Sequence, residues 1–202
     1  DRKKSFLEGT PRIVRASEKH SISEFGARRA HGPLSATLGA RAAFIGGVSS
    51  TSNVLTDYLY GVPASGTMAH SWIQMFDTEY LAFKTYCEIY PDNVVLLIDT
   101  YNIMKSGMPN AIKAFDEVLK PKGVRPKAVR LDSWDLAYLS KKVREELDKA
   151  GYEDCKICAT NSLDEKTIKE LLEEGAQIDL FGVGENLITA KSEPVFGGVY
   201  KL

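Results

Sequence analysis

The sequence predicts an α/β protein in which parallel strands close into a (β/α) barrel. Short apolar segments of strand length alternate with amphipathic helical segments at intervals of about thirty residues, a spacing typical of parallel strands joined by right-handed crossovers. Several strands are apolar throughout, which indicates burial on both faces. Because about seven or eight such units fit into the chain, a closed barrel is favoured over an open sheet.

The predicted strands follow one another along the whole chain. Residues 21–26 show the period-two alternation of a strand, and residues 43–48 indicate a turn into a short strand. The further strands are expected at residues 62–66, 94–98, 128–132, 156–160, 178–183 and 197–202.

Helices are expected between these strands. Pro33 suits the first turn of a helix over residues 33–44, and the polar side chains of residues 49–53 can cap a helix over residues 54–60. A long amphipathic helix is predicted from about Ser71 to Tyr90. The remaining helices are expected at residues 111–119, along the stripe Leu136, Leu139, Val143 and Leu147, and around Ile168, Leu171 and Leu172.

Composition favours one domain over residues 1–202, with a basic, poorly patterned lead-in at residues 1–19. A net charge of -1 argues against a protein that binds nucleic acid or a membrane surface, and the apolar runs are too short to span a bilayer. A signal peptide is not expected before the charged residues 1–4. Three cysteines form a sparse, odd set that fits a reducing compartment, so a cytoplasmic protein is expected.

Cys155 and Cys158 spell C-x-x-C, a spacing found in redox and zinc sites. Here the pair leads into a predicted strand, where residues three apart point to opposite faces. The sequence has no second pair, so a structural role is predicted and no metal site is expected.

Polar residues collect where the predicted strands end. In a barrel the carboxyl ends of the strands form one rim, which is where active sites are built. The residues at these ends are Phe25, Gly26 and Arg28, residues 50–53, His70, Asp99, Arg130 with Asp132, Asn161, and residues 182–185.

His70 is predicted at a junction between a strand and a helix. Unpaired N–H groups and the positive end of the helix dipole favour anions at such a position, which suits an imidazole that meets phosphate. A buried histidine satisfied by its neighbours is the alternative.

Arg130 and Asp132 are two residues apart, so both point to the face opposite Val129 and Leu131. If the apolar pair packs on helices, the charged pair points into the barrel mouth. The pair needs either a mutual salt bridge or a ligand, because unpaired charges are costly to desolvate. The Gly182–Gly184 turn and Arg28 are weak indications alone, but together these features favour an anionic substrate.

Five motifs together resemble nicotinate phosphoribosyltransferases, from about residue 11 to the end of the chain. They are residues 24–32 (EFGARRAHG), 66–72 (GTMAHSW), 97–101 (LIDTY), 130–136 (RLDSWDL) and 181–185 (FGVGE). The resemblance implies an irregular, TIM-like (β/α) barrel of the type II phosphoribosyltransferase kind. It also implies a transferase that joins nicotinate to 5-phosphoribosyl-1-pyrophosphate, giving nicotinate mononucleotide and pyrophosphate for NAD biosynthesis. ATP is the co-substrate, and Mg²⁺ accompanies the pyrophosphate.

The resemblance also implies roles for individual residues. His70 is expected to be phosphorylated, with Asp99 near it and near the metal-bound pyrophosphate. Phe25 would stack on the pyridine ring, while Arg28 and Arg130 approach the nicotinate carboxylate or the ribose phosphates. Asp132 would contact the ribose hydroxyls, and Ser52 would favour the acid over the amide, because a carboxylate there would repel nicotinate. Further substrate-binding positions are Ser133, Asn161, Gly182, Gly184 and Glu185.

The chain departs from the family pattern in two places. Trp134 occupies a glycine position and is predicted to impair binding of phosphoribosyl pyrophosphate. The resemblance also implies a further N-terminal α/β region, which is expected to be absent here together with an aromatic residue that would stack on the pyridine across a homodimer interface. A catalytically impaired truncated or engineered scaffold derived from the enzyme is therefore the second hypothesis. A different phosphate-handling barrel such as an aldolase is less favoured, because no strand end carries a Schiff-base lysine.

Overall fold

The structure is a computed structural model that describes residues 10–189. It is an α/β fold, and the strand pairs with a defined register run parallel, which confirms the predicted class. The described residues divide into two compact units. The first runs to Gly66 and includes Asn161–Glu173 and the segment from Phe181, whereas the second comprises Thr67–Thr160 and Glu174–Leu180. The prediction of one domain stays a prediction.

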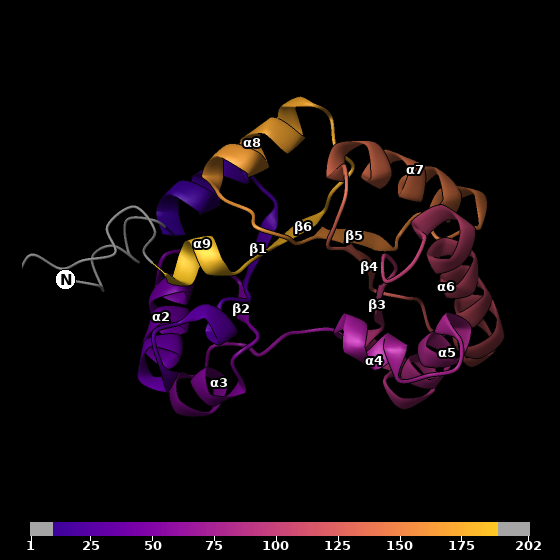
Figure 1. The fold of residues 1–202 in the computed structure, drawn as a ribbon, viewed down its shortest axis with the longest axis horizontal. Helices are drawn as coiled ribbons and strands as arrows, with labels where there is room; N and C mark the ends of the chain where they lie inside the picture. The colour runs from indigo at the N-terminus through magenta and orange to yellow at the C-terminus, as the bar shows by residue number, and fades with distance from the viewer. Residues whose placement is uncertain (1–9, 190–202) are drawn as a thin grey trace, which may run out of the picture. The chain divides into compact units, whose positions relative to one another are not determined.

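The first unit is built on β1 (Ser21–Glu24), β2 (Ser50–Thr51) and all but the first residue of β6 (Leu180–Val183), in the order β2-β1-β6. Figure 1 shows three of its helices beside one another. These are α2 (Pro33–Ile45), α3 (Val54–Tyr60) and α9 (Glu185–Ile188), and the unit also contains η1 (Ala27–Arg29) and α8 (Glu165–Glu173).

The second unit is built on β3 (Val95–Leu97), β4 (Ala128–Leu131) and β5 (Lys156–Ala159), in the order β5-β4-β3. Its helices include α4 (His70–Gln74), α5 (Glu79–Ile89), α6 (Met108–Ala114) and α7 (Leu136–Lys149). Figure 1 shows α5, α6 and α7 on the outer side of these strands. The unit also contains the 3-10 helices η2 (Pro91–Asn93) and η5 (Lys120–Lys122) and the π-helices η3 (Ile103–Gly107) and η4 (Phe115–Leu119).

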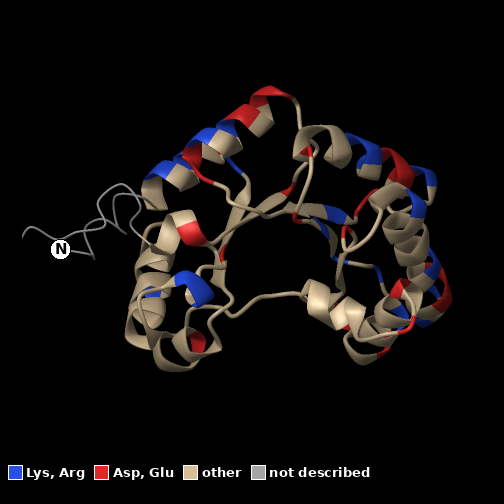
Figure 2. Ribbon diagram, viewed as in Figure 1, with Lys and Arg blue, Asp and Glu red and all other residues tan. Residues whose placement is uncertain are grey.

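Charged side chains lie mainly on the outer helices. Figure 2 shows basic and acidic residues interspersed along α7 and α8. In α7 they pair at helical spacing, for example Arg144 with Asp148 at 2.7 Å and Lys142 with Glu145 at 2.9 Å. Among the described residues, none of the helices combines the length and the apolar character needed to cross a membrane.

The prediction of one long helix from Ser71 to Tyr90 is wrong. The chain instead forms α4 and α5, separated by a break that ends at Thr78. The Thr78 hydroxyl accepts a hydrogen bond from the Leu81 backbone N–H at 3.2 Å, so it caps a second helix. The apolar stripe continues across the break, which is why periodicity alone suggested one helix.

Two predicted strands also differ from the structure. Residues 62–66 form only one isolated bridge, between Ala64 and Thr51, and the adjacent Pro63 has no backbone N–H to extend a ladder. Residues 43–45 belong to α2, which ends at Ile45 and is followed by Gly46 and Gly47, and the strand starts only at Ser50. Gly47 has φ 106°, a conformation that glycine adopts without strain after a helix.

Part of the predicted lead-in is packed against the fold. Residues 10–16 are helical, and Ile13 and Ser17 are buried. Residues 1–9 lie outside the described residues. The strand predicted at residues 197–202 lies outside the described residues.

Candidate functional site

His70 is the first residue of α4, and three polar side chains surround its ring. The ring Nδ1 lies 3.0 Å from the Thr100 hydroxyl oxygen, and the ring Nε2 lies 3.4 Å from Asp132 Oδ2 and 4.0 Å from Asp99 Oδ1. The dipole of a long helix was expected to favour anions at His70, but α4 has only five residues, so its dipole is weak. The ring is instead oriented by hydrogen-bonding and charged groups from the ends of β3 and β4.

Asp99 follows β3 and connects it to the loop after β4. Its Oδ2 accepts hydrogen bonds from the Asp132 backbone N–H at 2.8 Å and from the Ser133 hydroxyl at 2.5 Å. Its other oxygen, Oδ1, is buried without a hydrogen-bond partner and faces His70. A buried oxygen of this kind is costly unless a ligand, water or cation meets it.

Arg130 and Asp132 alternate with buried apolar residues on β4, as predicted. Val129 and Leu131 are fully buried, whereas the Arg130 side chain is 13% exposed and the Asp132 side chain 30% exposed. Arg130 Nη2 lies 3.9 Å from Asp132 Oδ2, too far for a direct hydrogen bond, and Arg130 Nε is buried without a partner. The mutual salt bridge is therefore present but leaves the guanidinium with unused donors.

One carboxylate oxygen joins the cluster. Asp132 Oδ2 lies 3.4 Å from His70 Nε2 and 3.9 Å from Arg130 Nη2. The imidazole and the guanidinium therefore lie at the same end of β4 in the second unit. The other oxygen of Asp132 accepts a hydrogen bond from the Thr160 hydroxyl at the end of β5.

The donors in this cluster suit an oxygen-coordinated cation. Mg²⁺ is usually held by one or two carboxylates together with substrate phosphates. Asp99 Oδ1 and the Asp132 carboxylate provide such oxygens. Among the described residues, no group of three or more His, Cys, Asp or Glu side chains is arranged to hold a metal ion.

Trp134 lies in the loop after β4 and has φ 67°, in the left-handed region that glycine favours. Its side chain points to solvent, with 77% of the residue exposed. The backbone thus keeps the conformation expected for the glycine of the motif, although the residue is tryptophan.

Several predicted residues come together in the first unit. The Phe25 backbone N–H donates to the Val183 carbonyl at 2.8 Å, and the Ser52 N–H donates to the Glu24 carbonyl at 2.9 Å. A Cβ on Gly184 would lie 3.1 Å from the Phe25 carbonyl oxygen, so this glycine permits a close backbone approach.

The other predicted residues of this unit have different surroundings. Arg28 is exposed on η1, and its neighbour Arg29 pairs with Glu185 at 3.7 Å. Asn161 has φ 88° and opens a loop whose Ser162 carbonyl accepts a hydrogen bond from Asn186 of α9. Gly182 lies within β6 and is buried, so the predicted glycine turn is limited to Gly184. The strand continues through Gly182 because its neighbours Phe181 and Val183 are core residues.

Sequence reasoning missed four polar residues. Thr100 and Thr160 contact His70 and Asp132, and their position at strand ends was the available indication. Glu24 is fully buried. Burial raises the pKa of Glu79, which accepts hydrogen bonds from Ser106 and Asn110 and so ties α5 to the segment after β3.

The C-x-x-C pair has the predicted structural role. Cys155 and Cys158 are free thiols buried in the second unit, and burial raises the pKa of each to about 12. A thiol with such a pKa is a poor nucleophile and a poor metal ligand at neutral pH.

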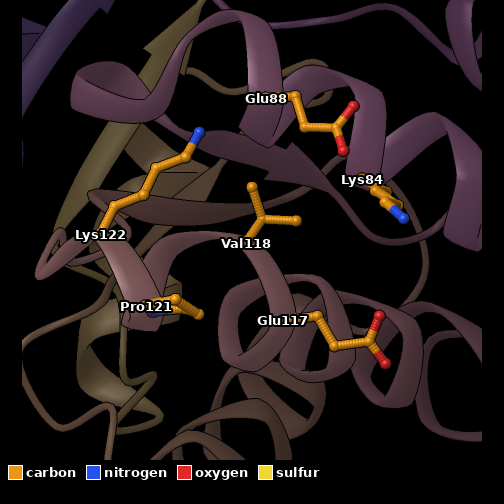
Figure 3. Close-up of a pocket in the computed structure, with 6 residues that line it drawn as sticks. All are labelled: Lys84, Glu88, Glu117, Val118, Pro121 and Lys122. Atoms are coloured by element: carbon orange, nitrogen blue, oxygen red, sulfur yellow. The ribbon is translucent and has the colours of Figure 1, made fainter.

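A shallow pocket of about 360 Å³ lies elsewhere on the second unit (Figure 3). Figure 3 shows two lysines and two glutamates around it, so its lining favours neither sign of charge. The residues that line it are Lys84, Glu88, Glu117, Val118, Pro121 and Lys122, none of which was predicted as a site residue.

Residues 20–197 match the model of the Nicotinate phosphoribosyltransferase (NAPRTase) family. The chain is 52% identical to the nicotinate phosphoribosyltransferase of Bacillus subtilis over 181 residues, which covers 89% of this chain and 36% of that protein. It is 44% identical to the nicotinate phosphoribosyltransferase pncB2 of Mycobacterium tuberculosis over 193 residues, covering 95% of this chain and 40% of the relative.

The fold is similar to solved structures of the same kind. The crystal structure of human nicotinic acid phosphoribosyltransferase matches with a TM-score of 0.81 and 26% identity, covering 91% of this chain and 47% of the human chain. The crystal structure of nicotinate-nucleotide pyrophosphorylase from Pyrococcus furiosus matches with a TM-score of 0.79 and 30% identity, covering 93% of this chain and 47% of the Pyrococcus chain. The chain therefore spans less than half of the length of these relatives.

Proposed function

Because the chain belongs to the nicotinate phosphoribosyltransferase family, we propose that it joins nicotinate to 5-phosphoribosyl-1-pyrophosphate, giving nicotinate mononucleotide and pyrophosphate. The product would enter NAD biosynthesis. One observation carries the proposal: His70 and Arg130 both approach Asp132 Oδ2, at 3.4 and 3.9 Å. This arrangement supports a single site that accepts anionic ligands, as the proposed substrates require.

The proposed reaction is a displacement at the anomeric carbon of the ribose. The pyridine nitrogen attacks this carbon while the bond to pyrophosphate breaks, through a state with oxocarbenium character. The ring nitrogen needs no general base, so positioning and electrostatic stabilisation provide the catalysis. Arg130 would stabilise the charge that develops on the leaving group, and Asp132 would hold the ribose hydroxyls. Asp99 and Asp132 would hold Mg²⁺, which would supply positive charge to neutralise the leaving pyrophosphate.

ATP coupling is proposed to act through His70, which would accept the γ-phosphoryl group of ATP as ADP leaves. The His70 side chain is 39% exposed, which supports access for a nucleotide. Thr100 would hold Nδ1 at its 3.0 Å hydrogen bond while the carboxylates of Asp99 and Asp132 face the other ring nitrogen. Ser133 would keep Asp99 in place through its hydrogen bond.

In the first unit, Phe25 would stack on the pyridine, Arg28 would approach its carboxylate, and Ser52 would favour the acid over the amide. The phosphate loops would be formed by Asn161, Gly184 and Glu185.

At the level of the whole protein, we propose a closed, irregular TIM-like barrel, completed in the longer relatives by an N-terminal α/β domain. Parallel strands and the matched length support this architecture. A homodimer and a cytoplasmic location are part of the same proposal, with small molecules as partners rather than nucleic acid or membrane.

A second candidate function is a catalytically impaired scaffold. Trp134, whose φ of 67° lies in the region that glycine favours, supports this candidate. Incubation with radiolabelled ATP separates the two candidates. The enzyme predicts a label that is stable to base, lost in His70→Ala and retained in His31→Ala, a matched change at an exposed histidine. Absence of label in the unmodified chain would favour the scaffold.

A further inference from the structure

Glu24, the last residue of β1, is fully buried and both of its carboxylate oxygens are hydrogen bonded. Oε1 accepts from the Gly26 backbone N–H, and Oε2 accepts from the Thr51 hydroxyl at 2.6 Å. Burial raises the pKa of Glu24, and both hydrogen bonds oppose this shift. Glutamate is almost never fully buried unless its oxygens are paired, so this side chain forms a specific contact between two chain segments.

The first of these segments is β2, which has only two residues. A strand this short forms few main-chain hydrogen bonds, so side-chain contacts matter more for its position. Glu24 pairs with Thr51 in the register and accepts the Ser52 N–H on its main-chain carbonyl at 2.9 Å. Thr51 Oγ1 also accepts from the Asn53 N–H at 3.0 Å. The Glu24 carboxylate therefore fixes the Thr51 side chain, and the Glu24 main-chain carbonyl fixes the backbone N–H of Ser52.

The second segment is the turn at Phe25. The Glu24 carboxylate bonds to Gly26, so the turn closes around Phe25. On the other side there is no free space, because a Cβ on Gly26 would lie 2.6 Å from Ile188 Cβ and 2.8 Å from the Gly184 carbonyl oxygen. The backbone of Phe25 is thus fixed between Glu24 and the end of β6.

We propose that Glu24 is a positioning residue that holds Phe25 and Ser52 in a fixed relation, so that the surface for a pyridine carboxylate exists before the ligand binds. The inference rests on the proposed function, which assigns pyridine stacking to Phe25 and selection of the acid to Ser52. Preorganisation of this kind increases affinity because less ordering is required on binding.

The same two strands provide a matched control. Ser23 and Ser50 are the preceding pair in the register, and their hydroxyls lie 2.8 Å apart. Because successive strand residues point to opposite faces, this contact lies on the face away from Glu24. Ser23→Ala removes it. Thr51→Val removes the hydroxyl that donates to Glu24 while the shape of the side chain stays almost the same. Thr51→Ser keeps this hydroxyl.

Titration calorimetry with nicotinate, and separately with phosphoribosyl pyrophosphate, tests the proposal. We expect Thr51→Val and Glu24→Gln to weaken nicotinate binding about tenfold, the effect of one lost hydrogen bond to a charged group. Thr51→Ser and Ser23→Ala should bind nicotinate like the unmodified chain, and all four variants should bind phosphoribosyl pyrophosphate equally well. Thr51→Val and Glu24→Gln variants that bind nicotinate as tightly as Ser23→Ala would overturn the proposal.

Amide hydrogen exchange decides the positioning role without any ligand. Thr51→Val should accelerate exchange at the Gly26 and Ser52 amides about tenfold, while Ser23→Ala leaves both rates unchanged. Equal exchange rates in the two variants would overturn the proposal. An unmodified chain that binds no nicotinate contradicts the proposed function alone, and the exchange rates still decide the role of Glu24.

Discussion

Trp134 occupies a backbone conformation that glycine adopts without strain. Its φ of 67° brings the Cβ of an L-residue close to the following carbonyl, at a cost of about 1–2 kcal/mol. The indole gains little in return, because 77% of the residue is exposed. The loop must therefore be held by its neighbours, and the bond from the Ser133 hydroxyl to Asp99 is one such contact.

Trp134→Gly is expected to stabilise the chain by about 0.5–1 kcal/mol, since relief of strain exceeds the added freedom of glycine in the unfolded state. Urea unfolding measures the change. Trp134→Ala is the matched control, because it deletes the indole but keeps the strained Cβ, and it should leave the free energy of unfolding nearly unchanged. Equal stabilisation by both variants would exclude backbone strain as the cause.

The same pair of variants tests whether the indole obstructs phosphoribosyl pyrophosphate. If it does, both Trp134→Gly and Trp134→Ala should bind this ligand more tightly in calorimetry. No gain in affinity from either change would contradict the predicted impairment.

For single residues, the sequence predicted which side chains are buried better than it predicted which side chains contact one another. The partial exposure of Arg130 and Asp132 and the full burial of Val129 and Leu131 follow from local alternation along one strand. The contacts of Thr100 with His70 and of Thr160 with Asp132 join segments far apart in the chain. Such pairs depend on strand register and loop geometry, which a single sequence does not specify.

At the scale of elements, helix ends were predictable where a side chain caps them. The boundaries of α3 agree with the prediction because Asn53 accepts from the Leu55 N–H at 3.1 Å, a local interaction readable from sequence. Between α4 and α5 the continuous apolar stripe led to the prediction of one helix, although Thr78 is a capping residue that indicates the start of a second helix. Capping residues inside a periodic segment therefore mark a break that periodicity does not detect.

Removal of the Thr78 cap should destabilise the second unit. Thr78→Ala leaves the Leu81 N–H without its partner, and we expect a loss of about 1 kcal/mol in the free energy of unfolding. Thr78→Ser keeps the hydroxyl and should lose much less. Thermal or urea unfolding measures both, and an equal loss in the two variants would show that the threonine methyl group, rather than the cap, is responsible.

At the scale of the whole molecule, the α/β class was predictable because alternating helices and parallel strands are encoded in the apolar pattern along the chain. Closure of a barrel was less accessible from sequence. It depends on the register and tilt of every strand, and the pattern of residues 62–66 resembled a strand although these residues form only one bridge.

The reactivity of the three thiols measures unfolding of the second unit, because all three are buried there. They are Cys87, Cys155 and Cys158. Burial raises the pKa of each thiol to about 12, so very little thiolate exists at pH 8. We expect almost no reaction with a thiol reagent in native buffer and reaction of all three cysteines in concentrated guanidinium chloride. Since unfolding of the unit must precede modification, the three should react at one common rate in intermediate denaturant. Fast reaction of Cys155 or Cys158 in native buffer would contradict their structural role and reopen a redox interpretation of the C-x-x-C pair.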